Sequence, residues 1–83
     1  MLPRLKDLAI EEVSVNKKFT VNRVQLWFQD GRELSLTVKT VTGRIKGPID
    51  GYDVSYALQN LLGIPLYNDD AFVTRFNKIM WRE

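Results

Sequence analysis

The chain has 83 residues, a formal net charge of +2, and apolar and charged shares of 45% and 27%. This length suits one domain, and this balance is typical of a folded protein rather than a disordered one. The chain contains no cysteine and no histidine, which excludes disulfides, thiolate metal sites and the commonest catalytic base. The sequence therefore predicts a single non-enzymatic domain that needs neither a metal nor a cofactor.

Size also bears on oligomeric state and location. A core this small is marginal, and dimerisation would relieve the shortage, so a monomer and a homodimer both stay open. Residues 1–15 include five charged side chains and no apolar run of the kind found in a signal peptide. No apolar run approaches the roughly 20 residues that span a bilayer. We therefore expect a cytoplasmic protein that does not cross a membrane.

The first segment with a regular pattern is residues 2–12. Leu2, Leu5, Leu8 and Ala9 follow one helical stripe, and Pro3 suits a first helical position. The sequence therefore indicates a short N-terminal helix. Beyond it, residues 13–15 alternate as a strand does, and residues 16–18 have the composition of a turn.

The strongest pattern is a long β-hairpin over about residues 19–42. Apolar residues occupy every second position on both sides of Asp30-Gly31, the typical signature of a hairpin turn. The alternation slips by one residue at Asn22-Arg23. A β-bulge there would return both apolar sets to one face, and two separate strands are the alternative.

The parity of the apolar positions selects the length of the turn. A two-residue loop would place the apolar sets of the two strands on opposite faces of the sheet. A three-residue loop over residues 29–31, with Gly31 in a left-handed conformation, pairs Leu26 with Leu34 and Val24 with Leu36. The sequence therefore favours the three-residue loop, and Trp27 is expected to point away from the core.

Two helices are predicted after a glycine-containing loop over residues 43–51. The first covers about residues 53–62, with Asp50 or Asp53 as its N-cap, Gly63 after its last turn, and Ile64 and Pro65 beyond. The second covers about residues 69–81, with an apolar stripe and acidic residues at its start. The predicted fold class is α+β, a small antiparallel sheet with both helices packed on one face.

Positive charge is concentrated in the hairpin. Residues 16–47 hold seven basic and two acidic residues, a local net charge of +5, and Trp27 lies among them. Such a surface suits nucleic acid or another polyanion, although lysines on a strand edge also serve simply to discourage aggregation. The predicted contact set is Lys17, Lys18, Arg23, Trp27, Arg32, Lys39, Arg44 and Lys46.

A second interpretation places function in the helices. Tyr52 and Tyr56 lie one turn apart, and aromatic groups with a polar end are common anchors at protein interfaces. The chain would then be an accessory or inhibitor module with a protein partner, and a homodimer would suit this reading. The predicted interface set is Tyr52, Tyr56, Gln59, Tyr67 and Trp81.

Overall fold

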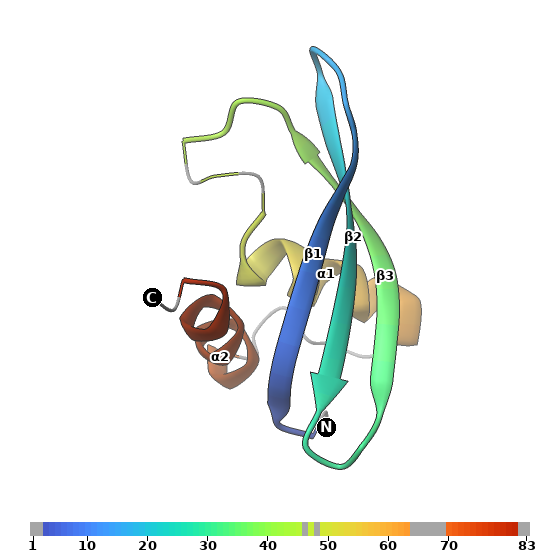
Figure 1. Ribbon diagram of the computed structural model, residues 1–83, viewed down its shortest axis with the longest axis vertical. Coiled ribbons are helices and arrows are strands. Elements are labelled where there is room, and N and C mark those ends of the chain that lie inside the picture. Colours follow the sequence, from blue (N-terminus) through green and yellow to red (C-terminus); the bar gives the residue numbers. More distant parts are fainter. Residues whose placement is uncertain (1–2, 46, 48, 64–69, 82–83) are drawn as a thin grey trace.

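The computed structural model describes residues 3–45, 47, 49–63 and 70–81 (Figure 1). Three strands come first and two helices follow: β1 (Leu5–Val15), β2 (Phe19–Phe28), β3 (Glu33–Val41), α1 (Gly51–Leu62) and α2 (Asp70–Met80). The strands form one antiparallel sheet in the order β1-β2-β3. Both helices pack on the same face of it, α1 against β3 and α2 against β1. The predicted α+β fold is confirmed.

The core lies between one face of the sheet and the two helices. Alternate residues of β2 and β3 supply its sheet side, because successive side chains of a strand point to opposite faces. Phe72 and Phe76 of α2 lie one turn apart with ring centroids 6.2 Å apart, and Phe76 is fully buried. The buried apolar cluster consists of Leu5, Val24, Leu26, Phe28, Leu36, Val38, Ile49, Val54, Leu58, Phe72, Phe76 and Ile79.

The turn between β2 and β3 has the predicted three-residue form. The Phe28 amide donates to the Arg32 carbonyl at 2.9 Å, and Gly31 has a φ of 91°. Leu26 lies opposite Leu34 in the register that parity selects. The hairpin is therefore confirmed, and so is the placement of Trp27 on the face away from the core.

The predicted N-terminal helix is wrong, because residues 5–15 form strand β1. Leu5 and Leu8 are three residues apart, as on a helix, yet both point to the core side of the sheet. The pairing between β1 and β2 shifts by one residue between Leu5 and Asp7. This bulge inserts an extra residue into the strand and so reproduces a helical spacing. Residues 1 and 2 lie outside the described residues.

The predicted bulge at Asn22-Arg23 is also wrong. β2 pairs with β3 in one uninterrupted register, and Thr20 and Asn22 are the residues that point to the core side. The alternation therefore continues through this region with polar residues in positions where apolar ones were expected. The irregularity lies in the neighbouring strand, where the β1 register shifts between Glu12 and Ser14.

Local signals at the other element ends are confirmed. Asn16 makes the β1–β2 turn, where its side-chain oxygen accepts from the amides of the two residues 18 and 19, both at 2.8 Å. Asp50 is the N-cap of α1, and together with Asp53 it forms a capping box. Gly63 follows α1 in the left-handed conformation. Ile64, Pro65 and the start predicted for the second helix at residue 69 lie outside the described residues.

Candidate functional site

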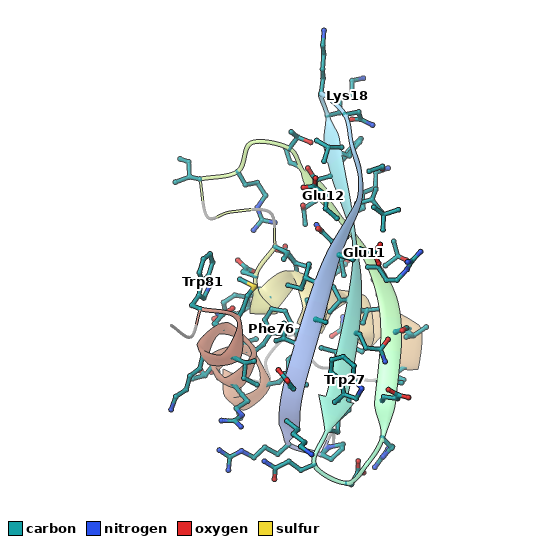
Figure 2. All side chains as sticks on the ribbon, in the orientation of Figure 1. Glu11, Glu12, Lys18, Trp27, Phe76 and Trp81 are labelled. Atoms are coloured by element: carbon teal, nitrogen blue, oxygen red, sulfur yellow. The ribbon has the colours of Figure 1, made fainter. Side chains whose placement is uncertain are left out.

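The residues predicted to contact a polyanion do not form one patch. Lys17 and Lys18 lie in the β1–β2 turn, at the end of the sheet opposite to the β2–β3 turn that carries Arg32 (Figures 1 and 2). Arg23 is between these ends, on the open face of the sheet, which is the face that the helices do not cover. Lys46 lies outside the described residues. Among the described residues, Lys17 and Lys18 take part in no ion pair.

Three arginines of this set are paired with carboxylates. Arg23 lies 3.2 Å from Glu11 across the β1–β2 pair, and Arg32 lies 2.7 Å from Asp30 within the hairpin turn. The Arg32 amide and guanidinium both donate to Asp30, and these bonds hold the pKa of that carboxyl below its ordinary value. Arg23 and Arg32 therefore each have a carboxylate partner within the chain, although both arginine side chains stay more than half exposed.

Arg44 has a structural position at the start of α1. Its guanidinium lies 2.7 Å from Asp53 and 3.4 Å from Asp50, the two residues of the capping box. All three side chains are largely withdrawn from solvent, with Arg44 22% exposed. This cluster ties the segment after β3 to the first turn of α1, so Arg44 is not available to an external ligand in this arrangement.

Trp27 lies on the open face of the sheet, between Asp7 and Glu33 in register. Its side chain is 36% exposed and borders a shallow hollow of about 420 Å³. The other residues that line the hollow are Lys6, Asp7, Phe28, Gly31 and Arg32. The hollow thus combines the exposed ring of Trp27 with two cations and one carboxylate, an arrangement that could stack a planar anionic group.

The edge of the sheet that β3 forms is open. β3 pairs with β2 on one side, and no strand in the described part of the chain pairs with its other side. The Arg32 carbonyl accepts from Phe28 of β2, and the Thr42 amide donates to the Lys18 carbonyl just before β2. Because the bonding direction alternates along an antiparallel strand, the odd-numbered residues direct their amides and carbonyls outward. We call this row the open edge: Glu33, Ser35, Thr37, Lys39 and Val41.

The two edges of the sheet differ in how they are protected. β1 carries two register shifts and the exposed carboxylates of Glu11 and Glu12, features that discourage pairing with a further strand. Its first residues are also covered, since Arg75 of α2 donates to the Leu5 carbonyl at 3.0 Å. β3 keeps a regular register over its whole length. The open edge of β3 is therefore the edge better suited to accept a strand.

Two predicted interface residues lie beside this open edge. Tyr52 and Tyr56 are 57% and 61% exposed, and they border a hollow of about 290 Å³ between α1 and β3. Thr37 and Lys39 of the open edge form its other side. In Figure 1 the C-terminal end of α1 emerges beyond β3, and Leu61 at that end is exposed. The structure thus places an aromatic and aliphatic surface next to unpaired strand backbone.

The remaining members of the interface set do not join this surface. Gln59 is partly buried, and its carbonyl accepts the Gly63 amide at 2.9 Å. Trp81 lies beyond α2 (Figure 2), and a Cβ added to Gly47 would lie 3.6 Å from its ring. Tyr67 is outside the described residues. The predicted set therefore separates, and Tyr52 and Tyr56 remain together.

Sequence reasoning missed the open edge itself. Glu33, Ser35 and Thr37 are ordinary polar positions of an alternating strand, and they gain significance only from the order of the strands. That order depends on β1, of which residues 5–12 were predicted as a helix and only residues 13–15 as a strand. Recognising that residues 5–15 form a strand would have identified β2 as the central strand and β3 as an edge.

No helix formed by the described residues is long and apolar enough to cross a membrane. Within those same ranges, no three acidic residues gather closely enough to hold a metal ion. Comparison with protein-family models, with curated proteins and with solved structures finds no match.

Proposed function

We propose that this protein is a protein-interaction module that binds an extended segment of its partner along the open edge of β3. The observation that carries this proposal is the adjacency of the unpaired backbone of Thr37 and Lys39 to the exposed rings of Tyr52 and Tyr56. Strand addition to a sheet edge supplies main-chain hydrogen bonds, and a neighbouring pocket for side chains supplies selectivity. Tyrosines are among the residues that most often anchor an interface.

The test uses a displayed library of random peptides selected against the folded protein. We expect the selected peptides to bind the wild type and not Thr37→Pro. Proline lacks the backbone amide that points outward at this position, and the substitution leaves the hydrogen bonds between β3 and β2 in place. Tyr56→Ala should weaken the same peptides about tenfold or more, the usual effect of truncating an anchor. Fluorescence anisotropy of labelled peptides measures both effects.

Thr37→Ala is the matched control, because it shortens the same side chain and keeps the amide. It should bind the peptides as the wild type does. Circular dichroism and urea unfolding establish that each variant is folded. Peptides that bind Thr37→Pro and Tyr56→Ala as well as the wild type, or a library that yields no binder, would contradict the proposal.

A second candidate function is favoured by the hollow at Trp27. We propose that this hollow is a site for a polyanion, because Lys6 and Arg32 flank the exposed indole of Trp27 there. The Trp81→Phe variant leaves Trp27 as the one tryptophan of the chain, so its fluorescence reports on this hollow. Quenching by a single-stranded oligonucleotide that weakens steeply with salt would support this function. Unchanged fluorescence at low salt would eliminate it.

A further inference from the structure

We infer that the segment received by the open edge is β3 of a second copy of this chain, so that two copies join their sheets into one of six strands. This inference rests on the proposed function and specifies the partner. It follows from the sequence of β3 itself, because a strand that pairs with its own copy around a two-fold axis must be complementary to itself. The pairing must also be antiparallel, with outward-facing residues opposite outward-facing residues.

Charge complementarity selects one register. With Leu36 on the two-fold axis, Ser35 lies opposite Thr37 of the second copy, and Glu33 lies opposite Lys39 of the second copy. The symmetry produces the Glu33–Lys39 pair twice, once on each side of the axis. Glu33 and Lys39 are the two charged residues of β3, so this register pairs all of its charges. Opposite charges directly across a strand pair stabilise it, and like charges destabilise it.

The neighbouring register lacks this property. With Thr37 on the axis, Lys39 lies opposite Ser35, and Glu33 lies opposite Val41 at the edge of the paired region. Neither charge then lies directly opposite an oppositely charged residue, and the nearest such residue is a more distant diagonal neighbour. The register centred on Leu36 is therefore the one that the sequence of β3 favours.

The core side of the strand is compatible with the same register. Leu36 would face its own copy, and Leu34 would face Val38 of the second copy, which continues the apolar layer from one sheet to the next. Leu34 is only half-buried in the single chain, although it packs against the core cluster. The hollow beside Tyr52 and Tyr56 lies along the line that the incoming strand would follow. Pairing would therefore cover apolar surface that one copy leaves exposed.

The other edge does not offer an equivalent surface. β1 is interrupted by two register shifts, and its exposed half carries the adjacent carboxylates of Glu11 and Glu12, features that discourage pairing with a further strand. The part of the chain that the structure describes therefore has one sheet edge suited to self-pairing. Such a chain forms a closed dimer rather than a fibre, because the second copy occupies the edge that it uses.

The experiment measures mass by sedimentation equilibrium over a range of protein concentrations. We expect the wild type to double its mass as concentration rises. Glu33→Lys should weaken association about tenfold, and Lys39→Glu should do the same, because each places like charges opposite each other on both sides of the axis. The double variant Glu33→Lys with Lys39→Glu exchanges the charges and should restore association to within about threefold of the wild type.

Rescue by the exchange is specific to the proposed register. Far-ultraviolet circular dichroism and urea unfolding confirm that the three variants keep the fold, since Lys39 also lies 4.0 Å from the ring centroid of Phe19 and contributes there. Thr37→Pro should remain a monomer, and Thr37→Ala should dimerise as the wild type does. A dimer that is insensitive to these substitutions, or a double variant that stays as weak as the single ones, would overturn the inference.

The outcome also separates the inference from the proposed function. If the wild type is a monomer at every concentration and selected peptides still bind the open edge, the second copy is the wrong partner and the interaction function stands. If the wild type is a monomer and the selected peptides avoid the edge, both are wrong. If a dimer forms and persists in Thr37→Pro, association uses another surface and the inference is wrong, while the binding of selected peptides to the open edge decides the proposed function separately.

Discussion

Arg44 lies between the carboxylates of Asp50 and Asp53, at the point where the segment after β3 enters α1. Its sequence neighbourhood suggested a polyanion contact, because the surrounding residues 16–47 are strongly basic. The structure shows that partners from other segments decide what each charge can do. Arg23 is matched by a carboxylate on the neighbouring strand. A charge count along the chain does not contain such pairings, so this part of the candidate site could not be predicted.

The capping box of α1 makes a prediction at the level of one residue. The Asp50 side chain accepts from the amides of Tyr52 and Asp53 at 2.9 and 3.1 Å. Asp50→Ala should lower the free energy of unfolding by about 1–2 kcal/mol, because two helix amides lose their acceptor and Arg44 loses one carboxylate. Urea unfolding measures the change.

The matched control is Glu12→Ala, which removes an exposed carboxylate from β1. It should alter stability by less than about 0.5 kcal/mol, as surface substitutions usually do. A loss at Asp50 no larger than the loss at Glu12 would show that the cap does not stabilise α1.

At the level of elements, local patterns predicted most of the fold. The hairpin followed from alternation and from the parity of its turn, and both helices followed from their apolar stripes and caps. Strand β1 did not, because its bulge near Lys6 gives Leu5 and Leu8 a helical spacing. Thr20 and Asn22 caused the second error, because these polar residues are buried although their polarity is typical of surface positions. In both cases tertiary pairing overrides the local signal.

Two glycines permit a prediction about how the elements are joined. An added Cβ at Gly51 would lie 2.8 Å from the Val73 carbonyl oxygen, so α1 and α2 approach each other at this residue. Gly51→Ala should lower the free energy of unfolding by about 1–3 kcal/mol, because the backbone of α2 would have to move away. Gly31→Ala has open space around it, and its cost of about 1–2 kcal/mol comes from its positive φ alone.

Asparagine distinguishes the two causes. Gly31→Asn should recover much of the stability lost in Gly31→Ala, because asparagine tolerates positive φ better than alanine does. Gly51→Asn should be no better than Gly51→Ala, since the added Cβ meets the same backbone. Thermal unfolding of the four variants gives the comparison. Equal recovery at both glycines would mean that backbone conformation, rather than space, limits Gly51.

At the scale of the whole molecule, the two edges of the sheet differ in how well they could pair with a further strand. One edge is irregular, acidic and partly covered by α2, while the other is regular and lies beside Tyr52 and Tyr56. The sequence predicted the two tyrosines as interface residues, and the structure adds the strand backbone next to them. This juxtaposition joins residues of β3 and α1 that are distant in sequence, and it is visible only after the sheet order is known.

The most direct test of this account is amide hydrogen exchange along β3, followed by NMR at low and high protein concentration. Leu36 and Val38 bond toward β2 and should exchange slowly at both concentrations. Ser35 and Thr37 belong to the open edge, so their amides should exchange quickly in dilute protein and slowly in concentrated protein, as a second strand pairs with them. If the amides of Ser35 and Thr37 still exchange quickly when the protein is concentrated enough for its mass to have doubled, the account is contradicted.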